Sequence, residues 1–360
     1  MHLQNLQLIQ FKNYQKAKFD FVSGINCLLG RNGVGKTNLL DAIHYLSFTK
    51  SAFNAVDKDN ILHDNQFFSL KAKFEIQNKQ QEMLCAVQLG EKKQIKWAGK
   101  VYDKLSDHIG KVPLVMIVPQ DTDLIRDASE VRRKFFDGLL SQLDAQYLQH
   151  LIRYNHLLKQ KNALLKQLNE ANNFDRSRIE PFNQMLAPLA MAIAKVREET
   201  LVLLKEEFET FYKDLSGDSE AVAIQYETKV DSNFEEKLHD QMQADFYQGR
   251  STVGIHKDDY SFLIGDYPIK KFGSQGQQKS FLIALKLSQF KALERGLEKK
   301  PLLLLDDIFD KLDDKRIAYL LEMMANENFG QIFITDARPE RTKSYLEGLT
   351  ENKKYFELGD

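Results

Sequence analysis

Eight residues near the start of the chain have the types and spacing of a polyphosphate-binding loop. Residues 30–37 lie between the apolar run 25–29 and the amphipathic stretch 38–48, so the loop joins a strand to a helix. Backbone N–H groups of such a glycine-rich loop can surround phosphate oxygens at a helix N-terminus, which an ordinary turn does not do. We expect the nucleotide contacts to come from Gly30, Arg31, Asn32, Gly33, Val34, Gly35, Lys36 and Thr37. In this pattern Lys36 reaches the terminal phosphates and Thr37 offers its hydroxyl to Mg²⁺.

A second motif has the form of a metal-binding strand end. Residues 301–307 read Pro-Leu-Leu-Leu-Leu-Asp-Asp. Such a strand can present Asp306 to Mg²⁺ and place Asp307 beside it as the base that polarises water. Alone, the two aspartates could simply cap a strand. With the upstream loop present, we expect Thr37 and Asp306 to hold the metal, and Lys36 and Asp307 to be the catalytic residues.

The separation of the two motifs indicates a large insertion, because about 270 residues lie between Thr37 and Asp306. Shortly before the second motif, residues 273–278 read Gly-Ser-Gln-Gly-Gln-Gln and open a helical stretch at 279–295. A serine and glycines at a helix N-terminus leave free N–H groups at the positive end of the helix dipole. This segment is therefore a second surface that could contact phosphate.

Strands and helices that could position these motifs are visible in the residue pattern. Alternation of polar and apolar residues over 1–21 predicts strands, and the run 25–29 predicts a strand buried on both faces. Alternation over 67–101 predicts an antiparallel meander. Further strands are expected at 112–118, 221–226, 302–305 and 332–334, with 332–334 as the last.

The middle of the chain has helical periodicity. No glycine occurs between residues 139 and 216, and apolar residues recur at spacings of three and four on both sides of a break at 171–175. This predicts an antiparallel helical hairpin whose second helix Pro181 and Pro188 could split. Two interpretations remain open: an extended arm, or a compact helical subdomain.

Composition narrows the class without naming a partner. The 360 residues include 50 basic and 51 acidic side chains, so overall charge indicates no nucleic-acid partner. Two cysteines, Cys27 and Cys85, have no metal-binding spacing and suit a reducing compartment. The start of the chain lacks the pattern of a signal peptide, and no apolar run approaches the ~18 residues that span a bilayer. We expect a cytoplasmic protein without membrane contact.

The helix-opening segment resembles the signature motif of ABC-type ATPases. Its form is Ser-x-Gly-Gln-Gln, and it stands about thirty residues before Asp306. In that family the signature of one subunit closes on the ATP held by the phosphate loop of another. The resemblance implies ATP and Mg²⁺ as cofactors and an ATP-dependent homodimer, with Ser274, Gly276 and Gln277 acting in trans.

Other segments resemble the RecF family, bacterial recombination and gap-repair proteins with an SMC-like head. They are Phe-Lys-Asn-Tyr at 11–14, Pro-Gln-Asp at 119–121, Arg-Arg-Lys-Phe-Phe-Asp at 132–137, Gly-Ile-His-Lys-Asp-Asp at 254–259 and the run 306–313. The resemblance implies that Lys12 and Gln120 lie at the nucleotide and that Asp313 lies in a loop at the dimer seam. Gln120 could instead be a turn residue, Asp313 a helix cap and His256 a structural histidine.

The chain departs from the family pattern at four places. Lys12, Lys257 and Gln275 stand where the family has arginine, and Asp310-Lys311 replaces Ser-Glu. A lysine keeps the charge but loses the bidentate fork of arginine. Thr335 stands where transporters commonly have a histidine, so we expect slow hydrolysis.

The resemblance implies an α/β fold: an ABC-type head with a P-loop parallel sheet and an antiparallel meander, and an inserted helical domain. The head would comprise 1–128 and 246–360, and the helical domain 129–245. The implied function is ATP-dependent binding of single-stranded DNA, gapped DNA or single-strand/double-strand junctions in recombinational repair and replication restart. Such a protein would load recombination mediators, support the SOS response and hydrolyse ATP weakly, with stimulation by DNA.

Candidate DNA contacts are basic residues at two places, although each group could be an ordinary solvated face. They are Lys92, Lys93 and Lys96 on the meander, and Arg132 and Arg133 at the base of the hairpin.

Two other functions fit parts of the pattern. An ABC transporter's nucleotide-binding subunit would need a groove for a membrane protein. An SMC-type chromosome-maintenance ATPase has arms of hundreds of residues, whereas this insertion has only about 110.

Overall fold

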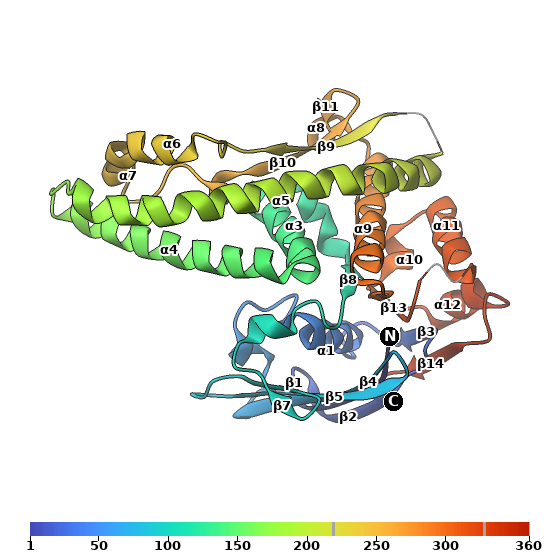
Figure 1. Cartoon of the computed structure of the whole chain (residues 1–360). Coiled ribbons are helices and arrows are strands. Elements are labelled where there is room, and N and C mark those ends of the chain that lie inside the picture. Colours follow the sequence, from blue (N-terminus) through green and yellow to red (C-terminus); the bar gives the residue numbers. More distant parts are fainter. Residues whose placement is uncertain (218–219, 327–328, 360) are drawn as a thin grey trace. The chain divides into compact units, whose positions relative to one another are not determined.

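The computed structural model describes residues 1–217, 220–326 and 329–359, and the chain forms two compact units (Figure 1). The first unit comprises residues 1–121, 214–217 and 279–360, and the second comprises 122–213 and 218–278. The predicted boundaries differ mainly at 246–278, which belongs to the second unit. The reason is strand pairing, because β10 (Asp259–Ile264) pairs with β9 (Val222–Glu227).

A five-stranded parallel sheet forms the centre of the first unit. Its strand order is β14-β3-β13-β12-β8, with β3 at Ile25–Leu29, β8 at Leu114–Ile117, β12 at Leu302–Leu305, β13 at Ile332–Asp336 and β14 at Lys353–Glu357. Every residue of β3, β8, β12 and β13 is buried, as their continuous apolar runs predicted. The expectation that 332–334 is the last strand is wrong. Strand β14 follows at the sheet edge, half-buried and without an apolar run.

A six-stranded antiparallel sheet confirms the predicted meander. Its order is β2-β1-β4-β5-β6-β7, with β1 at His2–Phe11, β2 at Tyr14–Asp20, β4 at Phe67–Ile76, β5 at Lys79–Gln88, β6 at Gln94–Trp97 and β7 at Lys100–Val101. Alternate residues of β4 are buried, from Phe68 to Phe74. They share one apolar core with helix α1 (Lys36–Phe48) and with residues of the parallel sheet such as Leu304.

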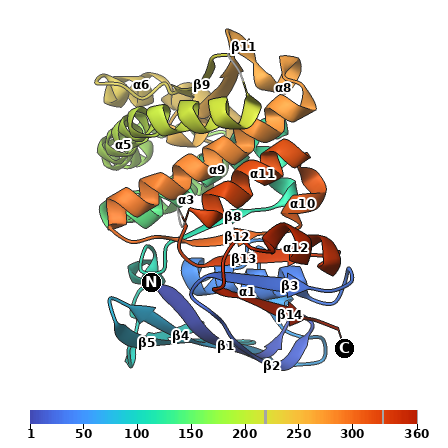
Figure 2. The same cartoon turned by 90° about the vertical axis from the view of Figure 1, so that its right-hand side faces the viewer.

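The remaining helices of the first unit follow the long insertion. They are α9 (Gln275–Leu297) from residue 279 onward, α10 (Ile308–Lys311), α11 (Asp314–Ala325) and α12 (Pro339–Leu346). Figure 2 shows α11 and α12 with strands β3, β13 and β14 of the same unit. The division between the two units thus falls inside α9, directly after Gln278.

The second unit combines helices with a small antiparallel sheet. Its helices are α2 (Asp123–Arg126), α3 (Ser129–Leu143), α4 (Ala145–Glu170), α5 (Arg176–Ser216, to residue 213), α6 (Phe234–Asp240), α7 (Met242–Gln248) and α8 (Ile269–Phe272). Strand β11 (Tyr267–Pro268) completes the sheet order β11-β10-β9. No helix among the described residues is long and apolar enough to cross a membrane.

Helices α4 and α5 form the predicted antiparallel hairpin (Figure 1). The two prolines that could have split the second helix do not, because α5 continues for 41 residues through Pro181 and Pro188. Both prolines are exposed. Water can therefore satisfy the carbonyls that lose a helical partner. The hairpin is not bare, since Leu165 of α4 and Ile179 of α5 share a core with Phe246 of α7.

Candidate active site

The predicted catalytic elements of the first unit meet at one edge of the parallel sheet. The phosphate loop follows β3, Asp306 follows β12, Thr335 lies near the end of β13, and Gln120 follows β8. Strand β13 pairs with both β3 and β12, so Thr335 lies between the two motifs. We call this the carboxyl edge. It is where open parallel sheets usually bind ligands.

The backbone of the loop requires glycine. Gly30, Gly33 and Gly35 have φ of 151°, 88° and 109°, a region that residues with a Cβ avoid. A Cβ on Gly35 would lie 2.5 Å from Nδ2 of Asn13. Asn13 Nδ2 donates to the carbonyl of Val34 at 3.2 Å. The segment 11–14, which the sequence analysis singled out, therefore contacts the backbone of the loop and helps to fix its conformation.

Lys36 is buried at the start of α1, with 5% of its surface exposed. Its ammonium donates to the carbonyls of Gly30 at 2.7 Å and Arg31 at 3.0 Å. These two bonds hold the ammonium of Lys36 against the backbone at the start of the loop. The side chains of Arg31 and Asn32 are exposed to solvent. A charge held beside the N-terminus of a helix is suited to an anionic ligand.

The two motifs are joined directly by hydrogen bonds. The hydroxyl of Thr37 donates to both carboxylate oxygens of Asp306, at 3.0 and 3.1 Å. Thr335 donates to Oδ1 of Asp306 at 2.7 Å and accepts from the backbone N–H of Asp307 at 2.9 Å. The sequence singled out Thr335 only because it stands where transporters commonly have a histidine, and its bond to Asp306 becomes visible only in the fold.

These oxygens fit the donor set of Mg²⁺, which binds one or two protein oxygens and completes its shell with water and phosphate. Hydroxyl and carboxylate converge here from two different elements. Among the described residues no group of three or more His, Cys, Asp or Glu could hold a metal ion. Thr37 and Asp306 thus present a hydroxyl and a carboxylate side by side, oxygen ligands of the kind that Mg²⁺ prefers.

Asp307 is the N-cap residue directly before α10 and has a left-handed conformation with φ of 45°. Aspartate tolerates this region better than most residues, but the conformation still costs free energy. Such conformations are kept where surrounding contacts fix them, here by the bond from Asp307 N–H to Thr335. The strained turn holds Asp307 beside the metal-side carboxylate.

The two other residues expected at the nucleotide have different surroundings. The ammonium of Lys12 pairs with the buried carboxylate of Asp41 at 2.6 Å. Asp41 also accepts from the hydroxyl of Ser51, so Lys12 belongs to a network behind the loop. Gln120 is exposed in the turn Pro119–Thr122, next to Asp121, which pairs with Lys286 at 2.7 Å.

The signature segment lies in the second unit and caps its helix. The N–H of Ser274 donates to Oε1 of Gln277 at 2.6 Å, and the N–H of Gln277 donates to Oγ of Ser274 at 3.2 Å. This reciprocal pair is a capping box. Ser274 is exposed and Gly276 half-buried.

Asp313, in the first unit, caps α11 by accepting from the N–H of Arg316 at 3.1 Å. It also pairs with the guanidinium of Arg316, as the helix-cap alternative predicted.

Three of the five residues proposed to contact DNA already form ion pairs or hydrogen bonds within the protein. Lys93 pairs with Asp57 at 2.8 Å and donates to the carbonyl of Thr49. Arg132 makes a two-pronged pair with Asp259, at 2.7 and 2.9 Å. Arg133 donates to the carbonyl of Asp258 at 2.6 Å. Lys92 and Lys96 are exposed, so of the five they alone present their charge to solvent.

A buried arginine that the sequence did not reveal explains two of the motifs. Arg197 of α5 is 2% exposed and pairs with Asp137 and with Asp258, each at 2.9 Å. Asp137 comes from the segment 132–137 and Asp258 from 254–259. Burial raises the pKa of Asp258. His256 lies nearby against Tyr154, and burial lowers its pKa to about 4, which agrees with a structural histidine. These motifs therefore hold the second unit together.

A phosphate loop, a carboxylate pair and a large insertion on a mixed α/β fold define the class of ABC-type ATPase heads found in SMC-like proteins. The family model described as RecF/RecN/SMC N terminal domain matches residues 2–352. "DNA replication and repair protein RecF" of Flavobacterium johnsoniae is 45% identical over 362 residues, which cover 99% of this chain and all of that protein. The chain belongs to the RecF family.

Two solved structures are similar over the whole fold. "Structure of the recombination mediator protein RecF-ATPrS in RecFOR pathway" has a TM-score of 0.89 and 28% identity, covering 99% of this chain and 96% of that one. The corresponding structure of RecF-ATP has a TM-score of 0.88 and 27% identity, covering 99% and 95%. The similarity includes the insertion, so it extends beyond the phosphate loop.

Proposed function

We propose that this chain binds ATP with Mg²⁺ at the carboxyl edge and hydrolyses it. The observation that carries the proposal is the direct bond between Thr37 and Asp306 beside the buried charge of Lys36. In this proposal Thr37 and Asp306 hold Mg²⁺, which when bound neutralises phosphate charge. Lys36 and the N–H groups of residues 30–37 bind the phosphates. Asp307 accepts the proton of the attacking water.

Lys12 and Gln120 have different roles in the proposed nucleotide site. Lys12 would reach the nucleotide only by leaving Asp41, so we assign it a role in positioning the loop. Gln120 is exposed at the carboxyl edge and keeps its place as a nucleotide contact. Hydrolysis is proposed to be slow, because the hydroxyl of Thr335, unlike the imidazole of a histidine, does not titrate near neutral pH.

We further propose that ATP joins two copies of the chain. Ser274, Gly276 and Gln277 of one copy would contact the γ-phosphate bound to the other, and Asp313 would lie at the seam. The exposed side chain of Ser274 and its place at the positive N-terminal end of α9 support this role. The domains would be an ATPase head, 1–128 and 246–360, and a helical domain, 129–245, with the signature segment 273–278 functionally part of the head.

We propose that the dimer acts on DNA in recombinational repair and replication restart, and so works in the cytoplasm. The names of the similar proteins support DNA repair and the RecFOR pathway. Single-stranded, gapped and junction DNA are the proposed substrates, recombination mediators the proposed partners and the SOS response the proposed outcome. Lys92 and Lys96 are the DNA contacts that remain in the proposal. DNA would stimulate a weak ATPase activity, and hydrolysis would return the protein to its state without bound DNA.

Sedimentation velocity with and without ATP, repeated with gapped duplex, tests this function. We expect a monomer without nucleotide, a dimer with ATP, and salt-sensitive co-sedimentation with DNA only in the presence of ATP. Duplex of equal length without a gap is the control. ATP binding without any change in mass or DNA retention would contradict the proposed switch.

A further inference from the structure

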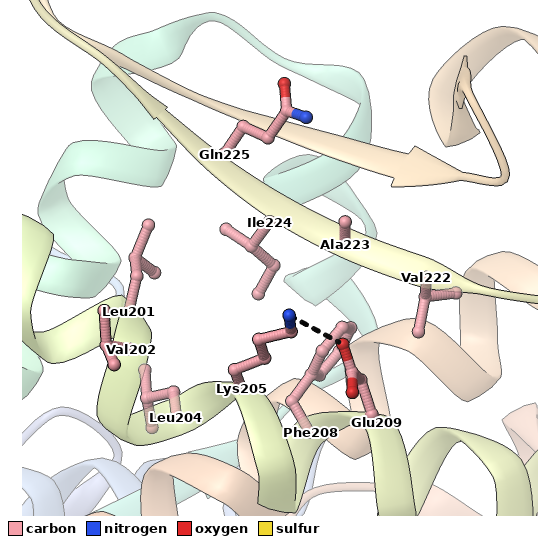
Figure 3. A pocket seen from close by; sticks show the side chains of 10 residues that line it. All are labelled: Leu201, Val202, Leu204, Lys205, Phe208, Glu209, Val222, Ala223, Ile224 and Gln225. Atoms are coloured by element: carbon pink, nitrogen blue, oxygen red, sulfur yellow. Dashed lines mark ion pairs between the residues drawn. The ribbon is translucent and has the colours of Figure 1, made fainter.

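Two features of the chain lie outside the groups that bind and hydrolyse ATP in the proposed function. One is a groove of about 310 Å³ in the second unit, lined mostly by apolar side chains of α5 and β9 (Figure 3). Its charged side chains, Lys205 and Glu209, pair with each other, so the groove alone does not identify a ligand. The other feature is the turn between β1 and β2 in the first unit, whose side chains contact the phosphate loop.

The turn between β1 and β2 is fixed to helix α1 at two points. It consists of Lys12 and Asn13, since β1 ends at residue 11 and β2 begins at residue 14. The ammonium of Lys12 pairs with Asp41 of α1 at 2.6 Å, and Nδ2 of Asn38 of α1 donates to Oδ1 of Asn13 at 2.8 Å. The turn therefore has a defined place beside the N-terminal half of α1.

Two neighbouring side chains bond consecutive carbonyls of the phosphate loop. Nδ2 of Asn13 donates to the carbonyl of Val34 at 3.2 Å, and the hydroxyl of Tyr14 donates to the carbonyl of Gly35 at 3.1 Å. A Cβ on Gly35 would lie only 3.0 Å from the hydroxyl of Tyr14, as well as close to Asn13. The glycine thus lets both side chains approach the backbone of the loop.

These two bonds also set the direction of two N–H groups. In a planar trans peptide unit, the C=O and the N–H that follows it point in opposite directions. Fixing the carbonyl of Val34 therefore orients the N–H of Gly35, and fixing the carbonyl of Gly35 orients the N–H of Lys36. Both N–H groups point away from the turn, and neither donates to a protein group among the residues that the structure describes.

We propose that Asn13 and Tyr14 are positioning residues that aim the N–H groups of Gly35 and Lys36 at the phosphates of ATP. This inference rests on the proposed function, because it requires that the loop bind ATP. Backbone N–H groups of such a loop contact the α- and β-phosphates, which ATP and ADP share. Asn13 and Tyr14 therefore raise the affinity for both nucleotides and take no part in proton transfer.

Titration calorimetry of the full chain with ATP and with ADP, each with Mg²⁺, tests the role of Tyr14. Tyr14→Phe keeps the ring beside Phe19 and removes only the hydroxyl. We expect Kd to rise about three- to tenfold for both nucleotides, the factor that a typical hydrogen bond contributes. Equal affinity of variant and wild type, or a loss for ATP alone, would overturn the proposal.

Steady-state hydrolysis separates positioning from catalysis. A contact that is equally strong before and during the reaction affects KM but not kcat. In Tyr14→Phe we therefore expect KM for ATP to rise by about the same factor as Kd, with kcat within about twofold of the wild type. A fall in kcat with unchanged KM would exclude the positioning role.

Tyr45→Phe is the matched control for loss of a tyrosine hydroxyl. Its hydroxyl bonds Asp57 near the other end of α1. The substitution can shift the urea midpoint, but we expect ATP to bind as it does to the wild type. If Tyr45→Phe weakens ATP binding as much as Tyr14→Phe does, the effect is a general loosening of α1 and the proposal is wrong.

Asn13→Ala is a second, independent variant, because it removes the donor to Val34. It should weaken ATP and ADP binding by a similar factor, whereas Asn65→Ala, which removes an amide bonded to the carbonyl of His63, should not. Failure of the wild type to bind ATP would contradict the proposed function and this inference together. ATP binding that is equally tight in the wild type, Tyr14→Phe and Asn13→Ala would refute only the positioning role.

Discussion

The hydroxyl of Thr37 donates to both carboxylate oxygens of Asp306, across 269 residues of sequence. The bond joins the first residues of α1 to the end of β12. It exists because the parallel pairing of β3, β13 and β12 brings their carboxyl ends to one edge. An insertion of any length between the motifs leaves this geometry intact as long as the strand order is kept.

Replacing Lys36 with alanine should abolish ATP binding and dimerisation together. The ammonium is already buried and held by two loop carbonyls, so its removal leaves the phosphate negative charge without a partner. Truncating one partner of a buried charge pair costs about 2–5 kcal/mol, a loss of roughly thirtyfold or more in affinity. Nucleotide titration and sedimentation velocity measure both effects. Lys16→Ala, at an exposed position on β2, is the control, and dimerisation of Lys36→Ala with ATP would contradict the model.

Asp307→Asn should bind ATP and dimerise but hydrolyse ATP slowly. The amide keeps the size of the side chain and loses the base, which should slow turnover by about 10²–10⁴. The trapped dimer should then persist on DNA. Asp306→Asn is the informative comparison, because it alters the group bonded to Thr37 and should also weaken Mg²⁺-dependent ATP binding. Unchanged hydrolysis in Asp307→Asn would remove it from the catalytic role.

Ser274 has two separable roles, as the cap of α9 and as a proposed phosphate contact. Ser274→Ala should lose about 0.5–2 kcal/mol of stability because the N–H of Gln277 loses its acceptor. Ser274→Asp keeps a cap but presents a negative charge to the phosphate. It should therefore unfold like the wild type in urea yet fail to dimerise, and Ser274→Arg should block closure by size. Each variant should bind ATP normally as a monomer; loss of that binding would exclude action in trans.

Acid should destabilise the first unit through His108. Burial lowers the pKa of His108 to about 4 from its ordinary 6.5. Its Nε2 lies 2.7 Å from the carbonyl of Leu46, which can only accept, so Nε2 carries a proton. With its pKa at about 4, the ring is neutral at pH 7. Because the folded pKa is depressed, this contribution to stability is complete above pH 6.5 and falls as the pH drops toward 4.

The loss would approach about 3 kcal/mol, from roughly 1.4 kcal/mol per pKa unit. Urea unfolding between pH 7 and 4 measures it. His108→Gln keeps a donor for Leu46 and cannot titrate, so its stability should depend less on pH over that range. Parallel pH profiles for variant and wild type would contradict the assignment to His108.

The sequence was most informative where one residue pattern has one physical solution. The runs 25–29 and 302–305 are apolar throughout because their strands are buried on both faces. The positive φ angles of the loop glycines and the capping box at Ser274 follow from local backbone chemistry. Strand β14 was missed because an edge strand needs no apolar run.

Contacts between distant charges could not be predicted from local patterns. Arg197 follows Asp137 by 60 residues and precedes Asp258 by 61, so no spacing rule connects them. The same reason explains why Lys93 was predicted to contact DNA. It is adjacent to Lys92 in the sequence, but the fold places Asp57 beside it as an ion-pair partner. Runs of basic residues therefore predict a charged surface only after internal pairs are known.

Charge reversal at Lys92 and Lys96 should weaken DNA binding without weakening the dimer. Both side chains are exposed near β6, at one side of the antiparallel sheet, and the neighbouring Lys93 is held by Asp57. Each lost phosphate contact reduces the salt dependence of log affinity by about 0.7–0.9, so the double Lys-to-Glu variant should lose up to about twice that slope. Anisotropy of gapped DNA across a salt series with ATP measures it. Lys16→Glu, on the opposite edge strand β2, carries the same charge change and should bind as the wild type. If both variants lose affinity equally, the effect is one of net charge and the DNA contacts lie elsewhere.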